Sequence, residues 1–480
     1  MNNIENILTE TCPDDFKQQL YTALKLAKKE FQDKKRSQGD KYIDHSIYTA
    51  IRLQKEGFDT ATVIGGLLHH IDINKSNLEY ITNNISIDIK KILTTYAQIS
   101  TVIKNTDSPY RTVTRYILNS VDDLRPVIIQ IFNAQSNSHI LKSIENDEER
   151  KEIVERNLNI HSNLAEYLGF DDIKTDINEE AFRITQKEDY EYIDRLYKKE
   201  NISKEKLEIY KQYIEKLLKD LKGQFRIEGR IKSKHSTFGK LDKFLKEGKR
   251  DPINHISDLI GIRIVCQRKQ TCFNVLDKIL DKAEISLDKF DDYISHPKPN
   301  GYKAMQGPVI FPKISSMMVE IQILTEDMYE YNTFGPASHI VYKESKKRLA
   351  KPSDQYKWIK EVQQSIQNNK NNSKKEFSIP ITVKISENEI YPLTPQGKII
   401  PLKKGYTITD FAYHIHTDIG NSMIGGKVNG KSVKFDYQLK TGDIVEIATQ
   451  KGKKRPKPEL IRYANSKRAQ IKIERAIKQS

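Results

Sequence analysis

The spacing of apolar residues changes along this chain, and the change indicates two kinds of fold. From Asp14 to about Phe170, apolar residues recur at i, i+3 and i+4, as in FKQQLYTALKLAKKEF, which is the pattern of amphipathic helices. From Phe225 onward, apolar and polar residues alternate as they do in a strand with one buried face. The sequence therefore predicts a helical domain followed by a domain built on a sheet.

The second domain combines predicted strands and helices. DLIGIRIVC and MMVEIQILT are apolar enough for buried strands, and TCFNVLDKILDKA between them has a helical period. These segments predict an α/β or α+β unit that ends near Lys347. A polar segment, NNKNNSKK, has the composition of a linker.

A small β-rich module is expected after the linker. FSIPITVKI, GKIIPL and DIVEIA read as short strands, TDFAYHIH reads as a helix, and Asn429-Gly430 is a hairpin signal. We expect domains at 1–195 and 196–347, a linker at 348–378, the β-rich module at 379–450 and a basic tail at 451–480.

Composition limits the class of protein. The 480 residues suit three or four domains, and no apolar run approaches the length of a membrane span. The first residues lack the features of a signal peptide, so we expect a cytoplasmic protein with free thiols. The formal net charge is +15, and residues 451–480 hold eleven Lys or Arg against two Glu. This excess is typical of nucleic-acid binding, although a solubilising surface would look similar.

Basic residues and carboxylates recur in the predicted sheet domain. GRIKSKHSTFGK places Arg230, Lys232, Ser236 and Lys240 at a strand end and on the following helix, where they could converge on a triphosphate. Asp258 and Arg263 fall on one predicted strand, where a structural salt bridge is the alternative reading.

A second carboxylate follows on another predicted strand. Glu320 alternates with Val319 and Ile321, so it can face a cleft while they face the core. Carboxylates on adjacent strands can hold the Mg²⁺ that phosphoryl transfer needs, whereas most such residues simply face solvent.

The string PKPNGY is the most specific in the chain. Lys298 offers a charge to phosphate, Asn300 offers amide hydrogen bonds, and Tyr302 offers a ring on which a purine can stack. An ordinary Pro/Gly turn explains the six residues alone, but VEIQILT and GPASHIVYKE follow in order.

Together these motifs resemble the synthetase domain of the RelA/SpoT family. The resemblance implies a mixed-sheet, nucleotidyltransferase-like domain that moves diphosphate from ATP to the 3′-hydroxyl of GDP or GTP, forming (p)ppGpp in the stringent response. It implies that Asp258 and Glu320 hold Mg²⁺ and that Glu320 is the general base. The implied ATP-binding residues are Arg230, Lys232, Ser236, Lys240 and Arg263. The implied guanine-nucleotide residues are Lys298, Asn300, Tyr302, Gln322 and His339.

Some positions depart from that family pattern. Leu324 stands where an arginine is usual, and Gln306 stands where a histidine is common. Asp291 resembles the acidic motif variant of members that prefer GDP, but Lys289 stands where those have glutamate. We therefore expect altered phosphate binding or substrate preference, with a lean toward GDP.

The helical domain resembles the HD hydrolase of the same family. That site holds Mn²⁺ through His, His-Asp and a distant Asp. Here His45 and His69 remain, whereas His70 and Asn133 replace the two aspartates, and Ile73-Asn74 replaces an acidic pair. We expect the hydrolase to be lost and the domain to regulate the synthetase. A rearranged site of His45, His69, His70 and Asp72 is the alternative.

The last module resembles a TGS domain of β-grasp type. In ribosome-associated members this domain contacts the 3′ end of deacylated tRNA, which implies such a role for His414 and His416. Regulation within the chain is the alternative use. Later family regions, including the ACT domain, are absent from the sequence, so we expect ribosome docking to be weakened. The oligomeric state is not predicted.

The expected fold class is multidomain α+β, with an all-α HD-like domain, a mixed-sheet synthetase domain and a β-grasp TGS domain. Two rival functions stay open. One is a toxin-like enzyme that pyrophosphorylates the 3′ end of tRNA, and the intact PKPNGY loop argues against it. The other is a catalytically inactive RNA-binding regulator, supported only by Leu324 and Gln306.

Overall fold

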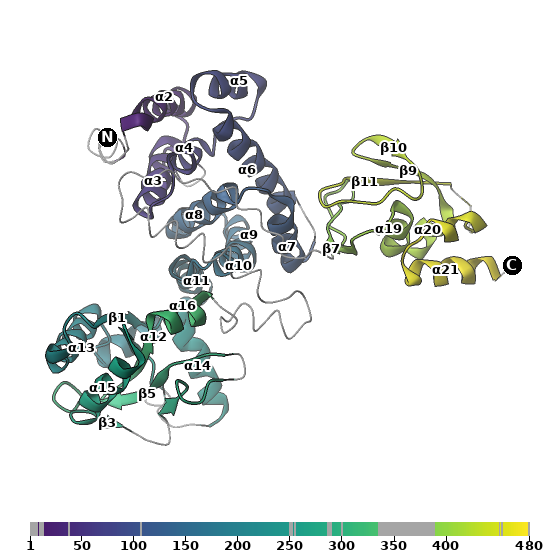
Figure 1. Ribbon diagram of the computed structural model, residues 1–480. Coiled ribbons are helices and arrows are strands. Elements are labelled where there is room, and N and C mark those ends of the chain that lie inside the picture. Colours follow the sequence, from purple (N-terminus) through teal and green to yellow (C-terminus); the bar gives the residue numbers. More distant parts are fainter. Residues whose placement is uncertain are drawn as a thin grey trace. The chain divides into compact units, whose positions relative to one another are not determined.

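A computed structural model of the chain describes residues 8, 14–36, 39–105, 108–248, 253, 256–285, 290–298, 301–334, 389–450, 452 and 455–478. It divides into two compact units, Met1–Leu168 with Glu361–Ser480, and Gly169–Lys360 (Figure 1). The predicted strand FSIPITVKI and the predicted linker lie outside the described residues. Among the described helices, none is long and apolar enough to span a bilayer.

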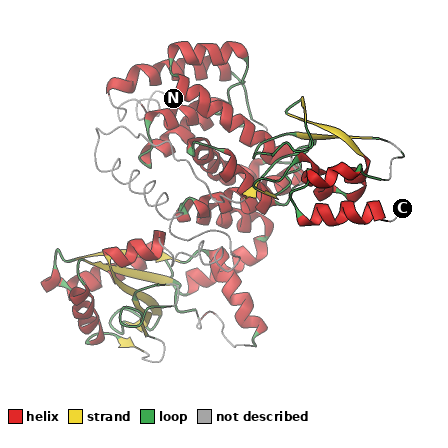
Figure 2. Ribbon diagram, turned by 45° about the vertical axis from the view of Figure 1, so that its right-hand side comes forward, coloured by secondary structure: helices red, strands yellow, loops and turns green. Residues whose placement is uncertain are grey.

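The first part of the chain is a helical bundle, as the apolar spacing predicted. Figure 2 shows strands only in the second unit and in the C-terminal module. Helix α8 is largely buried, with twelve of its sixteen residues in the interior. The helices of this part are α2 (Asp14–Phe31), α3 (Tyr42–Lys55), α4 (Thr60–Leu68), α5 (Lys75–Asn84), α6 (Ile87–Asn105), α7 (Tyr110–Ser120), α8 (Arg125–Ile140), η1 (Leu141–Ser143), α9 (Asp147–Arg156), the π-helical turn η2 (Asn157–His161) and α10 (Ser162–Tyr167).

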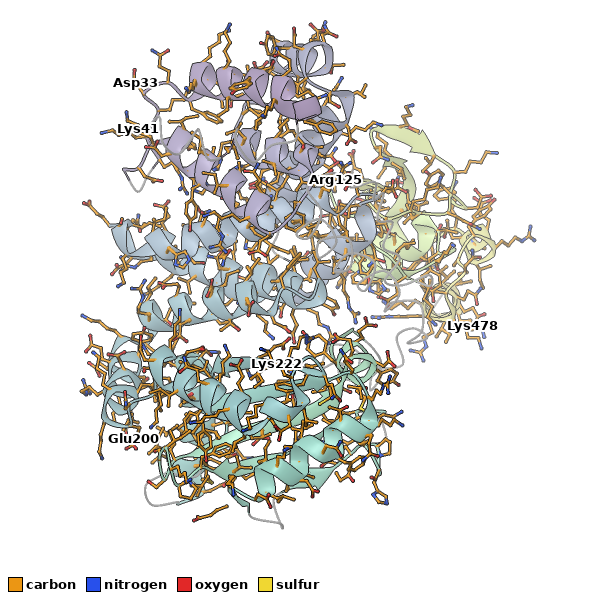
Figure 3. The ribbon with its side chains drawn as sticks, turned by 60° about the vertical axis from the view of Figure 1, so that its left-hand side comes forward. Asp33, Lys41, Arg125, Glu200, Lys222 and Lys478 are labelled. Atoms are coloured by element: carbon orange, nitrogen blue, oxygen red, sulfur yellow. The ribbon has the colours of Figure 1, made fainter. Side chains whose placement is uncertain are left out.

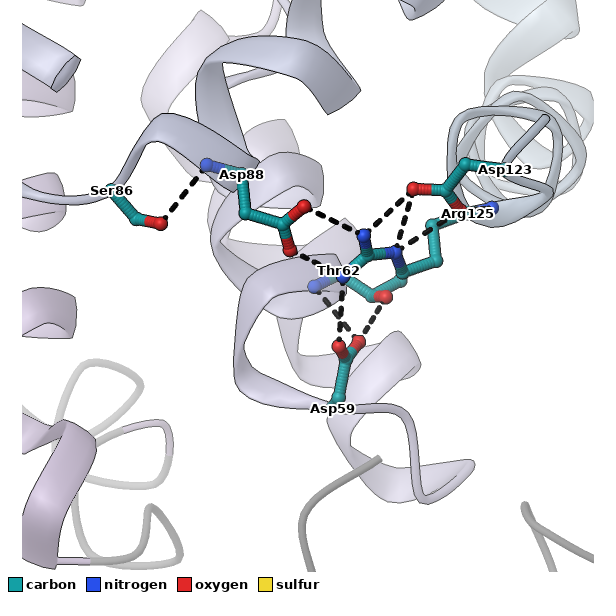
Figure 4. A network of polar contacts seen from close by, with 6 residues as sticks. All are labelled: Asp59, Thr62, Ser86, Asp88, Asp123 and Arg125. Atoms are coloured by element: carbon teal, nitrogen blue, oxygen red, sulfur yellow. Dashed lines mark hydrogen bonds and ion pairs between the residues drawn. The ribbon is translucent and has the colours of Figure 1, made fainter. Parts of the chain in front are cut away.

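One arginine joins the starts of three helices in this bundle. The guanidinium of Arg125, at the start of α8, lies 2.7 Å from Asp123, 2.7 Å from Asp88 and 3.2 Å from Asp59 (Figure 4). Asp59 is the N-cap of α4, and Asp88 lies in the first turn of α6. The cation therefore fixes α4, α6 and α8 against one another, since each carboxylate belongs to a different element.

The second unit is a mixed sheet covered by helices. Its strand order is β1-β2-β6-β5-β3, with β4 paired to β5, and only the β2–β6 pairing is parallel. The strands are β1 (Phe225–Ile231), β2 (Ile260–Cys266), β3 (Glu284–Ile285), β4 (Asp291–Asp292), β5 (Met305–Ile310) and β6 (Met318–Thr325). The helices are α11 (Asp171–Thr185), α12 (Lys187–Lys199), α13 (Lys204–Leu217), η3 (Lys219–Leu221), α14 (Lys234–Lys246), α15 (Lys269–Leu280) and α16 (Glu326–Phe334).

The second unit begins earlier in the chain than the expected boundary at residue 195. Helices α11 and α12 belong to it, because Phe182 packs on Phe238 of α14 with ring centroids 5.2 Å apart. Tyr197 of α12 also hydrogen-bonds Thr237 at 2.6 Å. An amphipathic helix shows that it has an apolar face, but its own period does not show which domain covers that face.

The C-terminal module is a small β-rich fold around one helix. Its elements are β7 (Glu389–Ile390), β8 (Leu402–Lys403), α19 (Ile408–Ile415), α20 (Thr417–Ser422), β9 (Met423–Val428), β10 (Lys431–Val433), β11 (Val445–Thr449), η6 (Pro458–Arg462) and α21 (Lys467–Lys478). Asn429 and Gly430 have φ of 51° and 78° and join β9 to β10, so the predicted hairpin is confirmed.

The residues expected to form a basic tail fold onto this module instead. Helix α21 buries Ala469 and Ile473 against Tyr413 of α19. The buried Asp410 carboxylate caps α19 and also accepts the backbone N–H of Ser466 at 2.8 Å, just before α21. Lys478, at the far end of α21, is exposed and points outward (Figure 3). The basic side chains of residues 467–478 therefore belong to a helix that packs on the module.

Candidate active site

Two carboxylates lie at the same end of the parallel strand pair in the second unit. Glu320 on β6 is opposite Gly261 on β2. Asp258 lies in the turn before β2, so the expectation that it shares a strand with Arg263 is wrong. The turn brings the carboxylate to the edge of the sheet, where Glu320 also emerges.

Asp258 is held by two lysines from neighbouring elements. Its Oδ2 lies 2.9 Å from Lys232 Nζ, just after β1, and 2.9 Å from Lys240 Nζ on α14. Burial alone would raise the pKa of the Asp258 carboxyl, but the hydrogen bonds from Lys240 and Lys232 outweigh burial and lower it. The other oxygen, Oδ1, is buried and has no hydrogen-bond partner among the described residues.

The ionised form of Glu320 is less stabilised by its surroundings than that of Asp258. Its neighbours Val319 and Ile321 are fully buried, while its own side chain points to the other face of β6, as predicted. Burial first, and then the charge of Asp258, raise the pKa of Glu320. A divalent cation between the two carboxylates would offset both effects and would satisfy Asp258 Oδ1. The donor set of the site thus fits Mg²⁺.

The beginning of α14 carries a ring of donors and hydroxyls. Ser233 is its N-cap and accepts the backbone N–H of Ser236, whose hydroxyl lies 2.9 Å away. The N–H groups of Lys234 and His235 are directed at the Glu179 carboxylate of α11, at 3.3 and 3.0 Å. A helix start that binds a carboxylate here can also bind phosphate oxygens. Sequence reasoning missed Glu179, because nothing local marks its contact with α14.

The predicted basic residues do not all converge. Lys232 and Lys240 meet at Asp258, whereas Arg230 is exposed on β1. Arg263 has partners other than Asp258: its Nε donates to Gln322 Oε1 at 2.8 Å, and its Nη1 lies 3.4 Å from Glu228 Oε2.

Two partners of Arg263 were not expected from the sequence. Its guanidinium lies 5.0 Å from the centroid of the Tyr329 ring. Glu228 stands directly opposite Arg263 in the antiparallel β1–β2 register. The alternation of charges along β1 was the available signal, since opposite charges on facing strands commonly pair.

A hydrogen-bonded triad fixes the predicted guanine-binding tyrosine. Gln322 Nε2 donates to the Tyr302 hydroxyl at 2.7 Å, and that hydroxyl donates to Gln306 Oε1 at 2.5 Å. The Lys298 ammonium lies 5.2 Å from the centroid of the Tyr302 ring and 4.2 Å from that of Tyr293. Asn300 and His339 lie outside the described residues.

The residues that depart from the family pattern lie in different surroundings. Gln306 belongs to the triad with Tyr302, and it also pairs with Asp291 across β5 and β4. Leu324 is 1% exposed in the core of the second unit. Lys289 lies outside the described residues.

A cluster of histidines occupies the helical bundle. The nitrogen atoms of His45 on α3, and of His69 and His70 after α4, lie within 4.8 Å of one another. Burial is the first cause that lowers the pKa of all three, to about 2 for His45 and about 4 for His69. Asn133 Oδ1 lies 3.0 Å from His45 Nε2. Asp72 is exposed, and among the described residues the cluster includes no carboxylate.

The two histidines of the C-terminal module lie at the two ends of a turn. His414 is exposed on α19, and partial desolvation, with Arg468 and Lys472 of α21 nearby, lowers its pKa. His416 is 65% exposed in its side chain and caps α20 through the N–H of Asp418. His414 therefore presents a neutral imidazole beside cations, whereas His416 is committed to its helix cap.

Three regions of the chain match protein families in the order that the folds suggest. An HD domain matches residues 23–171, a region found in RelA / SpoT proteins matches residues 229–347, and a TGS domain matches residues 390–449. These matches confirm the multidomain α+β fold class that the sequence predicted.

Curated relatives match over most of the chain. A guanosine-3′,5′-bis(diphosphate) 3′-pyrophosphohydrolase of Aquifex aeolicus is 33% identical over 96% of this chain and 65% of its own length. A GTP pyrophosphokinase of Myxococcus xanthus is 28% identical over 92% of this chain and 58% of its own. A bifunctional (p)ppGpp synthase/hydrolase of Escherichia coli is 27% identical over 99% of this chain and 67% of its own length. The chain spans 58% to 67% of the length of these relatives, and it belongs to the RelA/SpoT family.

Proposed function

We propose that this chain transfers diphosphate from ATP to the 3′-hydroxyl of GDP or GTP, with Asp258 and Glu320 as the ligands of Mg²⁺. The observation that carries the proposal is the state of Asp258. One of its oxygens is held by Lys232 and Lys240, while the other is buried and unpartnered beside a second carboxylate. Such a pair is suited to a cation that carries nucleotide phosphates.

The ATP side of the reaction depends on charge and position. Lys232, Lys240 and the N-terminal turn of α14 with Ser236 offer cations and N–H groups for the phosphates. When bound, Mg²⁺ neutralises charge that develops on the transferred group. Glu179 has to leave the N–H groups of Lys234 and His235 for phosphate to use them. Arg230, which is exposed, and Arg263 complete the proposed ATP site.

The acceptor side depends on Tyr302 and Glu320. The triad with Gln322 and Gln306 holds the Tyr302 ring, on which guanine stacks in our proposal, and Lys298 offers its charge to the acceptor phosphates. A base stacked on the face that Lys298 covers displaces that ammonium. Glu320 accepts the proton of the 3′-hydroxyl, because an ionised carboxylate beside the acceptor can act as a general base. Asn300 and His339 remain proposed nucleotide ligands.

We further propose that the HD domain has no pyrophosphohydrolase activity. Three neutral imidazoles and the amide of Asn133 occupy the place where a Mn²⁺ site needs carboxylates. The measurement is release of pyrophosphate from ppGpp in Mn²⁺ buffer. Release by the wild-type chain that disappears in a His69→Gln variant would contradict this part of the proposal.

A second function is proposed for the C-terminal module, which we expect to bind deacylated tRNA. Helix α21 places Arg468 and Lys472 beside His414. Cations bind phosphate, and a neutral imidazole can stack on or hydrogen-bond an unpaired base. The exposed ring of His416 lies two residues further on. Filter binding at increasing salt, with deacylated and aminoacylated tRNA, tests this function.

The decisive experiment for the synthetase is a transfer assay. Purified chain is incubated with γ-labelled ATP, Mg²⁺ and either GDP, GTP or deacylated tRNA. The variants are Glu320→Gln and, as a matched control, Glu284→Gln, an exposed residue of the same domain. Label in ppGpp or pppGpp that disappears only in Glu320→Gln is expected. Label only in tRNA would favour the toxin-like enzyme, and absence of transfer with ribosomes and tRNA added would favour the inactive regulator.

A further inference from the structure

The histidine cluster of the helical bundle consists of His45, His69 and His70. Their ring centroids lie 5.4 Å apart for His45 and His69, 5.3 Å for His45 and His70, and 4.0 Å for His69 and His70. Two of the rings follow α4 and the third projects from α3, so the cluster joins two helices. Packing alone gives no reason to gather three polar rings in a buried place.

The hydrogen bond of His69 leaves a lone pair on its other ring nitrogen. His69 Nδ1 lies 2.6 Å from the carbonyl oxygen of Gly66, which can only accept, so Nδ1 carries the proton. The other nitrogen, Nε2, therefore has a lone pair, and it is buried without a hydrogen-bond partner among the described residues. His70 Nε2 is buried and unpartnered in the same way. A backbone carbonyl that orients an imidazole in this manner is a common support of metal-binding histidines.

The fourth side of the cluster is an amide. Asn133 Nδ2 donates to the Tyr96 hydroxyl at 2.9 Å, which fixes the amide oxygen toward the rings, where it accepts from His45 Nε2 at 3.0 Å. His45 Nε2 therefore carries its proton in the metal-free chain, and a metal ion bound at this nitrogen replaces that proton. Two cations, Arg36 and Lys104, oppose a bound metal ion, and the guanidinium of Arg36 is paired with Asp40 at 3.0 Å. The lowered pKa values of the three histidines leave their rings neutral, and the amide of Asn133 is neutral as well.

A neutral set of imidazoles does not fit the Mn²⁺ that an HD hydrolase implies. Manganese and magnesium favour carboxylate oxygens, whereas imidazole nitrogens suit zinc, cobalt, nickel and copper. Around Zn²⁺ with Zn–N bonds of about 2.1 Å, tetrahedral nitrogens stand about 3.4 Å apart. The three nitrogens lie within 4.8 Å, so modest ring rotations bring them to that separation.

We propose that His45, His69 and His70 form a binding site for one divalent transition-metal ion of the zinc and cobalt class, supported by Asn133. The ion joins α3 to the end of α4 and stabilises the bundle, because it binds the folded chain and not the unfolded one. The proposal concerns the helical bundle alone and does not depend on the synthetase reaction.

The test uses the full-length, untagged chain after removal of metal by a chelator. Co²⁺ is added and its visible ligand-field absorption is recorded, then Zn²⁺, Mn²⁺ and Mg²⁺ are added as competitors. Calorimetry gives the stoichiometry. We expect one Co²⁺ per chain in a low-symmetry nitrogen site, displacement by Zn²⁺ and none by equimolar Mn²⁺ or Mg²⁺. Tighter binding of Mn²⁺ than of Co²⁺, or the absence of the absorption band, would overturn the proposal.

Three variants separate the cluster from other histidines. His70→Gln removes one ligand and is expected to weaken Co²⁺ binding on the order of a hundredfold. His296→Gln makes the same change at an exposed residue of the second unit and should leave binding unchanged. The double variant His70→Asp with Asn133→Asp supplies two carboxylates and is expected to shift the preference toward Mn²⁺.

Folding of the variants is checked without metal. Circular dichroism and thermal unfolding in chelator compare each apo variant with the apo wild type. Zn²⁺ should raise the unfolding temperature of the wild type and of His296→Gln, and should not raise that of His70→Gln. If Zn²⁺ stabilises His70→Gln as strongly as the wild type, the cluster is not the site and the proposal is wrong.

Discussion

Glu320 on β6 stands opposite Gly261 on β2 in parallel register. Gly261 follows Asp258 by three residues. This pairing brings two carboxylates of distant sequence position to one end of the sheet. Burial and the Asp258 charge raise the pKa of Glu320, whereas lysine hydrogen bonds lower that of Asp258. The site is therefore asymmetric, because Asp258 is paired with two lysines whereas the charge of Glu320 is not offset by a paired cation among the described residues.

That asymmetry predicts a pH-dependent gain of stability in Glu320→Gln. Ionised Glu320 costs the folded chain free energy, since its folded pKa is above the usual 4.5. The cost is complete above the folded pKa and disappears as the pH falls below the usual value. We expect Glu320→Gln to unfold at a higher temperature than wild type near pH 7.5 in chelator, with a smaller difference near pH 5.

Added Mg²⁺ should reverse this order. The ion satisfies both carboxylates of the wild type, so it should stabilise the wild type more than Glu320→Gln. Differential scanning calorimetry of both chains, with Glu284→Gln as control, provides the measurement. A stability gain in Glu320→Gln that does not change with pH would contradict the raised pKa.

Gly301 shapes the loop that carries Tyr302. Its φ is +80°, and a Cβ added there would meet the Tyr331 hydroxyl at 2.5 Å. Gly301→Ala must therefore shift the loop or Tyr331, and the position of the Tyr302 ring shifts with it. We expect the KM for GDP or GTP to rise on the order of tenfold, with the KM for ATP unchanged. Steady-state kinetics with each substrate varied in turn provides the measurement, and an equal rise in both KM values would contradict the assignment.

Much of this site follows from sequence patterns. The alternation of Val319, Glu320 and Ile321 predicts which side chain leaves the core, and the structure shows that orientation. The apolar run DLIGIRIVC predicts β2, but a continuous run does not mark where the strand begins. Asp258 was therefore placed on the strand, although it lies in the turn before it.

Other features depend on tertiary pairing that no local pattern contains. The partner of Arg263 is set by the register of β1 on β2, which places Glu228 opposite it. The net charge of residues 451–480 predicts a basic tail and does not indicate the few apolar side chains, such as Ile473, that pack α21 on the C-terminal module. A net charge describes the exposed face of a helix and does not reveal its buried face.

Arg125 is expected to be essential to the stability of the helical bundle. Its side chain and that of Asp59 are 13% and 11% exposed, so Arg125→Met leaves the buried Asp59 carboxylate without its cation. Removing one partner of a buried ion pair costs about 3–5 kcal/mol. Thermal and denaturant unfolding measure the loss. Lys75→Met, which removes a pair with Glu79 between two largely exposed side chains of the same bundle, is the control and should have little effect.

Asp410 links the C-terminal module to α21, and its removal should release that helix. The carboxylate accepts the backbone N–H groups of Thr407 at 2.8 Å, Asn465 at 3.0 Å and Ser466 at 2.8 Å. Asp410 is 2% exposed, so Asp410→Ala removes a buried acceptor from these donors, at a cost of about 3 kcal/mol. We expect faster tryptic cleavage within 455–478 and weaker tRNA binding, because Arg468 and Lys472 leave the side of His414. Asp436→Ala removes an exposed carboxylate of the same module and should change neither readout. Faster cleavage without any loss of tRNA affinity would show that α21 folds on the module but takes no part in RNA binding.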